Sequence, residues 1–139
     1  MDDPIGAKAI GKAVETSVKG VGRFLGKLCM PAAEEFGVLL RDKVAAYRLN
    51  NLEKIVEKAQ AKIDRQKIPV TGNVSPRVLK EVIEESSWAS DDTLQGMWAG
   101  LIAESASHAE SNDDTLTYIA ELKGLTAFQA RLRRCPGIC

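Results

Sequence analysis

Apolar residues recur along most of this 139-residue chain at the three- and four-residue spacing of an amphipathic α-helix. The first such stretch runs from Ile5 to Leu28, and its spacing places six large side chains on one stripe. The stripe consists of Ile10, Val14, Val18, Val21, Leu25 and Leu28. Five basic side chains lie largely outside it, namely Lys8, Lys12, Lys19, Arg23 and Lys27. Five glycines interrupt the stretch, and each destabilises a helix by about 1 kcal/mol relative to alanine. We therefore expect this helix to need a surface to dock on.

The next apolar pattern predicts a long central helix over about 32–67. Its start is indicated by Pro31, which suits a first helical turn, and by Glu34 and Glu35, whose charges suit the positive end of a helix dipole. A helix of this length spans roughly 54 Å at 1.5 Å per residue, which is long for a compact domain. Either it projects as one arm of a hairpin, or it breaks near Asn50-Asn51.

Three or four shorter helices are predicted after a loop at 68–75, which contains Pro69, Gly72 and Asn73. Ser75-Pro76 and the polar run 90–93 provide helix starts, and Thr126 with Gln129 has capping-box spacing. No segment alternates as a strand does. We therefore predict an all-α fold in three parts: an N-terminal amphipathic, glycine-rich helix over 1–30, a helical domain over 31–134 and an irregular tail over 135–139.

Charge is distributed unevenly along a chain whose 19 basic and 19 acidic residues cancel. Residues 71–125 carry three basic and ten acidic side chains, a net charge of −7, whereas 126–139 carry three arginines and no acid. Either the two halves pack together and their fields partly cancel, or they form two faces for different partners. The sequence disfavours nucleic acid as a partner, because acids dilute the basic residues of 32–70 and no aromatic stacking set accompanies them.

Residues capable of catalysis or metal binding are few. His108 is the single histidine, and Cys135 with Cys139 has a zinc-knuckle spacing that only Cys29 and His108 would complete. We interpret these thiols as free and the paired acids as capping or solvated groups. Neither a P-loop nor a dinucleotide-binding glycine motif is present. We therefore expect no enzymatic activity, no catalytic residue, no metal and no cofactor.

The hydropathy pattern predicts a cytoplasmic protein. The longest uncharged run with large apolar residues, 93–103, is about half of the roughly 20 residues that a membrane span needs. The chain opens on acidic Asp2 and Asp3, and no continuous apolar segment of a signal peptide follows.

Two G-x-x-x-G spacings, Gly22 with Gly26 and Gly96 with Gly100, allow helices to approach closely. They indicate either close packing inside the protein or a homo-oligomer contact through helix faces.

The apolar stripe and basic side of the N-terminal helix have two interpretations. The stripe either docks on the long helix, or it enters a surface outside the protein. A membrane-surface helix places such a stripe at the acyl boundary while its basic residues meet anionic head groups, and a groove on a partner protein is the other external surface. Contact with a membrane surface implies a peripheral location at the inner membrane.

Several short motifs, taken in order, resemble the bacterial abortive-infection alpha family. They are Phe24-Leu25, the segment 31–37, Asp42, Arg48, Asn51, Ile68-Pro69, the segment 94–101 and the segment 122–125. Within them we expect structural roles for Pro31, Glu34, Gly37, Arg48, Asn51, Leu94, Trp98, Ala99 and Leu101. Trp98 lies within a helical stripe and is expected to anchor the core. Arg48 and Asn51 share a helix face, and we expect them to bond either the loop 68–73 or acids of the C-terminal half.

The resemblance implies an all-helical protein linked to phage exclusion, and it brings no established chemistry. Family members generally continue beyond the helix that starts near Thr126, so we expect a truncated or frame-shifted end at 133–139. The leading hypothesis is a non-enzymatic defence protein that binds an unknown partner or an anionic membrane through residues 5–28. The alternative is a protein-interaction module, an adaptor or inhibitor within a defence operon.

Overall fold

The chain folds into helices, as the sequence predicts. The computed structural model describes residues 4–107 and 112–134, with side chains from Glu15 to Ser107 and for most of 115–132. Its elements are α1 (Pro4–Leu28), the 3-10 turn η1 (Met30–Ala32), α2 (Ala33–Asp42), α3 (Ala46–Gln66), α4 (Pro76–Ser86), α5 (Asp92–Ser107), α6 (Asn112–Lys123) and α7 (Ala127–Arg134). No β-strand occurs among the described residues, although Cys29 and Asn73 form an isolated bridge. His108, Cys135 and Cys139 lie outside the described residues.

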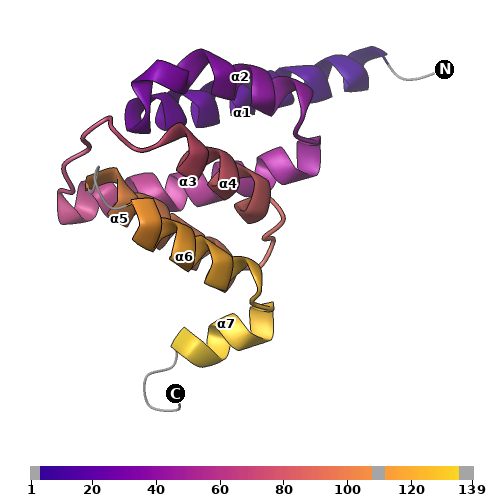
Figure 1. The fold of residues 1–139 in the computed structure, drawn as a ribbon. Helices are drawn as coiled ribbons and strands as arrows, with labels where there is room; N and C mark the ends of the chain where they lie inside the picture. Colours follow the sequence, from indigo (N-terminus) through magenta and orange to yellow (C-terminus); the bar gives the residue numbers. More distant parts are fainter. Residues whose placement is uncertain (1–3, 108–111, 135–139) are drawn as a thin grey trace.

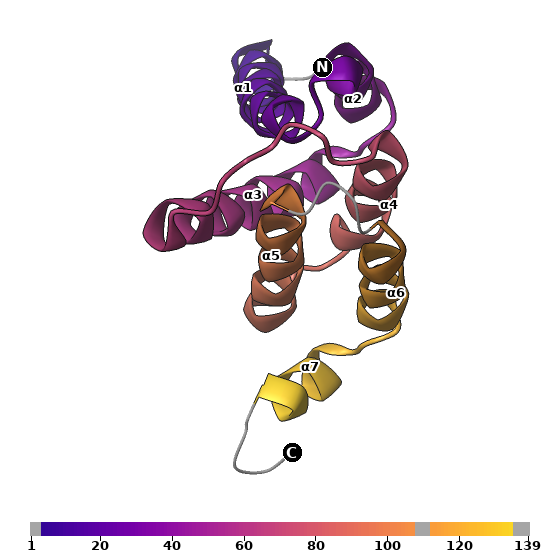
Figure 2. The same ribbon diagram turned by 60° about the vertical axis from the view of Figure 1, so that its left-hand side comes forward.

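The helices form layers on either side of α3 (Figure 1). Helices α1 and α2 lie together on one side, and α1 also contacts α3. Helix α5 packs along α3 on the other side, α4 packs against α6, and α7 contacts α5 at the far end (Figure 2). Helix α3 is therefore the central element between the two ends of the chain.

The predicted long central helix is present as α3, but the segment 32–67 is divided. Helix α2 ends at Asp42, and Ala45 is extended (φ −65°, ψ 155°) before α3 begins. The break lies at 43–45 and not near Asn50-Asn51, which are both inside α3. No glycine or proline marks it. The direction changes because α2 packs on α1 whereas α3 packs on α5, so tertiary contacts override a continuous helical pattern.

The start of α4 follows the predicted turn chemistry, because the Ser75 hydroxyl accepts a hydrogen bond from the Arg77 amide. Lys67 ends α3 in the left-handed region (φ 52°), although no glycine or asparagine marks that position. The loop 68–75 crosses the end of α1, where the Val74 amide donates to the Leu28 carbonyl at 3.0 Å. The capping box is also confirmed, because Thr126 and Gln129 exchange side chain–backbone bonds of 3.0 and 3.1 Å.

The core lies between α3 and its neighbours. Leu49, Leu52, Ile55, Ala59 and Ile63 place one face of α3 in it. Trp98 of α5 is 2% exposed and faces this core with Ala99 and Ile102, which confirms its predicted role as an anchor. The burial of these large apolar side chains between α3 and α5 stabilises the pair of helices.

Candidate interaction surfaces

The stripe of α1 is only partly available to a partner. Val18, Val21, Leu25 and Leu28 are each at most 3% exposed and belong to the core. These four residues are therefore covered within the protein. The prediction that they contact a membrane or a partner is wrong. The reason is that α2 and α3 supply the docking surface that a glycine-rich helix needs. The side chains of Ile10, Val14, Lys8 and Lys12 lie outside the described side chains.

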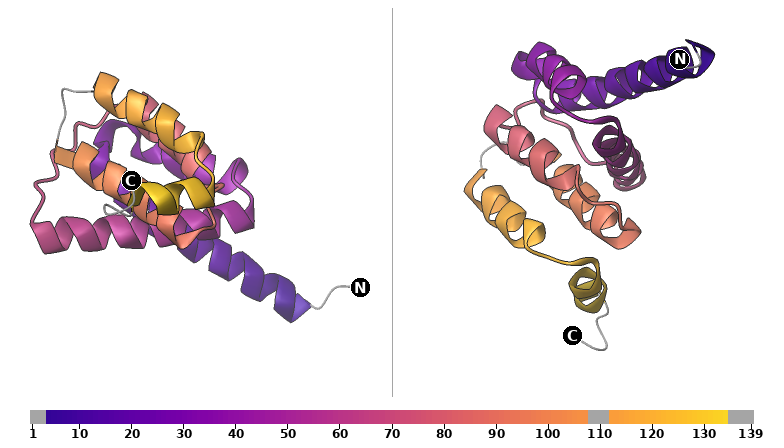
Figure 3. Two further views of the ribbon diagram at one scale, coloured as in Figure 1. Left: turned by 90° about the horizontal axis from the view of Figure 1, so that it is seen from below. Right: turned by 90° about the vertical axis from the view of Figure 1, so that its right-hand side faces the viewer.

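The backbone of α1 continues past this docked part. Its N-terminal half projects beyond α2 and α3 in two different views (Figure 3). On the docked half, Lys19, Arg23 and Lys27 are exposed, as expected for the basic side. The hydroxyl of Ser17 donates to Glu53 of α3 at 2.5 Å.

The first G-x-x-x-G spacing is a close internal contact. A Cβ atom at Gly26 would lie 3.2 Å from the Cβ of Ala33, and one at Gly22 would lie 3.9 Å from a methyl group of Leu40. Both neighbours belong to α2. In α5, a Cβ atom at Gly100 would meet the Lys62 amine at 3.3 Å, and one at Gly96 would meet nothing within 4 Å. Gly22, Gly26 and Gly100 therefore face neighbouring helices, whereas Gly96 is open.

Arg48 and Asn51 converge on the C-terminal end of α4. The last carbonyls of a helix have no partner within it and need donors from elsewhere. The Asn51 amide donates to the Ser87 carbonyl at 2.9 Å, and the Arg48 Nη2 atom donates to the Glu84 carbonyl at 3.2 Å. The Arg48 Nε atom also donates to the Ser87 hydroxyl at 2.9 Å, which itself donates to the Glu84 carbonyl.

These contacts decide between the two alternatives expected for the two residues. None of the three bonds reaches the loop 68–73, whereas Arg48 pairs with an acid of the C-terminal half, the Glu84 carboxylate at 3.5 Å. The Arg48 side chain is 10% exposed, whereas that of Glu84 is 62% exposed. A buried cation beside helix carbonyls also complements the negative end of the α4 dipole. The pair therefore has a structural role, as expected.

An aromatic surface lies directly over this contact. The guanidinium carbon of Arg48 is 4.2 Å from the centroid of the Trp88 ring, and the rings of Tyr47 and Trp88 are 5.9 Å apart and tilted by 59°. Tyr47 is 58% exposed and Trp88 is 56% exposed. We refer to Tyr47 and Trp88 as the aromatic surface. The sequence alone does not identify this surface, because Tyr47 and Trp88 are far apart along the chain and no local pattern joins them.

The remaining motif residues divide between core and surface. Ala99 is 2% exposed, and Leu94 and Leu101 are partly buried against the core. Pro31 and Glu34 are exposed, and Gly37 is half-buried with open space at its Cβ position. Helix packing therefore explains the motif in α5. Pro31 lies in the 3-10 turn between α1 and α2, and Glu34 lies in the first turn of α2.

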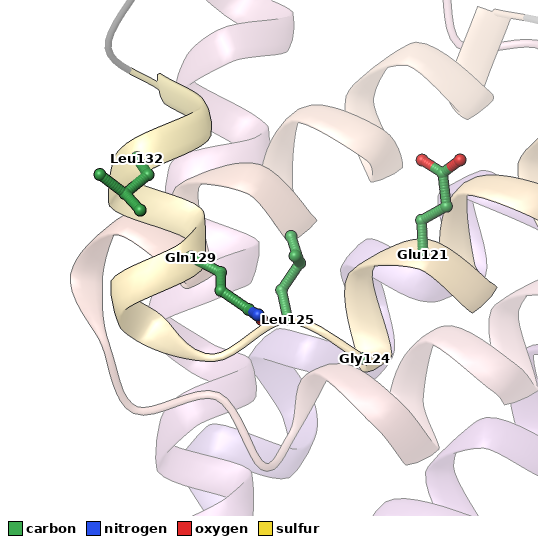
Figure 4. Close-up of a pocket in the computed structure, with 5 residues that line it drawn as sticks. All are labelled: Glu121, Gly124, Leu125, Gln129 and Leu132. Carbon is green, nitrogen blue, oxygen red and sulfur yellow. The ribbon is translucent and has the colours of Figure 1, made fainter. Parts of the chain in front are cut away.

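A second surface feature lies between α6 and α7. An open groove of about 370 Å³ is present there (Figure 4). It is lined by Glu121, Gly124, Leu125, Gln129 and Leu132.

No cluster of three or more histidine, cysteine or acidic residues suited to a metal is found among the described residues, and Cys29 is a buried free thiol. Among the helices that the structure describes, none is long and apolar enough to cross a bilayer.

Comparison with known proteins identifies a family. The model of the abortive infection alpha family matches residues 44–132, which is more than half of the chain. The match begins just before α3 and ends within α7, so it includes Arg48, Asn51 and the α5 motif but not Pro31, Glu34 or Gly37. No curated protein and no solved structure matches the chain.

The hydrogen bond from Asn51 to α4 is tested by Asn51→Ala. We expect this substitution to lower the free energy of unfolding by about 1–3 kcal/mol, because the buried Ser87 carbonyl loses its donor. Urea denaturation measures the change. Asn50→Ala is the matched control, since Asn50 is exposed on the same helix, and its effect is expected to stay within about 0.5 kcal/mol. Equal effects of the two substitutions would contradict the assigned role.

Proposed function

Because the chain belongs to the abortive infection alpha family, we propose that it is a non-enzymatic phage-defence protein that acts by binding a protein partner at the aromatic surface. Family membership suggests the role in abortive infection. The binding step is supported by one observation above all, the exposed and mutually contacting rings of Tyr47 and Trp88 inside the matched residues. An adaptor or an inhibitor would each act in this way.

The composition of the surface suits a binding hot spot. Tryptophan, tyrosine and arginine are the residue types most enriched where a few side chains dominate binding energy. Arg48 is held by α4 and lies against the Trp88 ring, so the ring is partly ordered before any partner arrives. Such preorganisation reduces the entropy lost on association.

The charge near the surface favours a partner with basic side chains. Helix α4 carries Glu81, Glu84 and Glu85 before Trp88, and residues 71–125 have ten acidic and three basic side chains. Glu84 is the acid paired with Arg48, and its side chain is mostly exposed. A basic partner would gain association rate from this field, and added salt would screen it.

Substitution of the aromatic surface tests this function. We expect Tyr47→Ala with Trp88→Ala to abolish phage protection by the full chain, because both large contact side chains of the surface are lost. The measurement is the efficiency of plating of a phage panel on bacteria that express each variant. Affinity capture from infected cells then compares the partner retained by each variant at low and high salt.

The control is Tyr118→Ala, which removes a ring of α6 that is 55% exposed. It is expected to keep both protection and the captured partner. Far-ultraviolet circular dichroism checks that the double variant remains helical. Protection by the folded double variant at the wild-type level would refute binding at the aromatic surface, and a wild-type chain that protects against no phage would refute the defence role.

Anionic membrane binding is a second candidate, favoured by the projecting half of α1 (Figure 3). Residues 4–14 carry Lys8 and Lys12 and no acid, and Ile10 and Val14 continue the stripe that is buried further along. A short amphipathic helix with basic residues binds anionic surfaces through its apolar area and its charge. Removing residues 1–30 would also remove core residues such as Leu25, so a gentler change is needed.

Flotation with liposomes that contain anionic lipid tests this candidate. If it is right, Lys8→Glu with Lys12→Glu lowers the floated fraction several-fold, because each basic residue near such a surface contributes about 1 kcal/mol. The matched control reverses two exposed lysines elsewhere, Lys54→Glu with Lys80→Glu, and is expected to float like the wild type. An equal loss for both pairs, or no flotation of the wild type, would count against α1 as the membrane contact.

A further inference from the structure

Helix α7 turns its large apolar side chains away from the bundle. Ala130 is completely buried, whereas Phe128 is 65% exposed and Leu132 is 41% exposed. Phe128 and Leu132 are one turn apart and share a face, and Ala130 is about 200° around the helix from Phe128. A helix that contacts only its own bundle is stabilised more by burying a phenylalanine or a leucine than by burying an alanine, because the larger side chains remove more apolar area from water. The outer face of α7 therefore has the composition of a contact with another molecule.

The groove between α6 and α7 lies beside this face. Gly124, Leu125 and Leu132 give it apolar walls, and Glu121 adds one carboxylate at the α6 side (Figure 4). The capping box between Thr126 and Gln129 fixes the turn that joins the two helices. The groove is open to solvent, so a side chain from another molecule can enter it. The groove and the exposed ring of Phe128 are thus complementary features of one short region.

We propose that a second copy of this chain covers this face, with the two α7 helices antiparallel and Phe128 of each copy seated in the groove of the other. A two-fold contact uses the same patch on both copies, so a patch that holds both a protruding ring and a groove with apolar residues in its wall can be self-complementary. The contact is separate from the aromatic surface, because Tyr47 and Trp88 belong to α3 and the segment that follows α4.

Charge supports a second copy as the occupant. The region 126–139 contains Arg131, Arg133 and Arg134 and no acid, while Glu121 lines the groove at the other end of the patch. In an antiparallel arrangement the arginine-bearing end of one α7 lies beside the Glu121 end of the other copy. The same pairing forms twice across the two-fold axis, and salt weakens it.

Sedimentation velocity over a wide range of protein concentration tests the proposal with the full chain. A reductant is present, so that cysteines do not link copies covalently. The wild type is expected to shift from monomer to dimer as concentration rises, and to do so at higher concentration when salt is added. Phe128→Ser is expected to weaken the dimer about tenfold or more, as for the loss of a central aromatic anchor. Glu121→Arg is expected to weaken it as well.

The matched control is Tyr118→Ser, which removes an exposed ring of α6 that does not line the groove. It is expected to leave the dissociation constant unchanged. Circular dichroism establishes that each variant stays helical. A wild type that remains monomeric throughout would overturn the proposal, as would a dimer that tolerates Phe128→Ser or one that Tyr118→Ser weakens equally. None of these outcomes bears on partner binding at the aromatic surface.

Discussion

The hydrogen bonds that α3 donates to the end of α4 are the constraint on which much of the structure depends. Helix α4 ends at Ser86, and its last carbonyls face two buried donors, Arg48 and Asn51. The following segment is held in turn, because Gln95 of α5 donates to the Ala89 carbonyl at 2.9 Å. A buried polar group without a partner costs about 1–3 kcal/mol, so these donors stabilise the end of α4 at this point.

The same contact explains why an exposed tryptophan has a defined place. The guanidinium that satisfies α4 also lies against the Trp88 ring, so one side chain serves both the core and the surface. The N-terminal helix shows the opposite case. Its stripe has the spacing of a membrane-surface helix, yet the half from Val18 onward is part of the core because α2 and α3 cover it. A stripe identifies an apolar face but not what covers that face.

Local signals in the sequence predicted the all-α fold and most helix ends. Ser75-Pro76, the capping box at Thr126 and the anchor Trp98 each depend on neighbours in the chain or on simple burial. The break at 43–45 and the aromatic surface depend on contacts between distant residues. Tyr47 and Trp88 are far apart in sequence, and no periodicity brings them together; only the attachment of α4 to α3 does so.

A double-mutant cycle between Arg48 and Ser87 measures the central contact most directly. Arg48→Met and Ser87→Ala, alone and together, are compared by urea denaturation of the full chain. A direct bond between the two side chains predicts that their effects on the free energy of unfolding differ from additivity by about 1 kcal/mol or more. Additive effects, within about 0.3 kcal/mol, would contradict the claim that this contact joins α3 to α4.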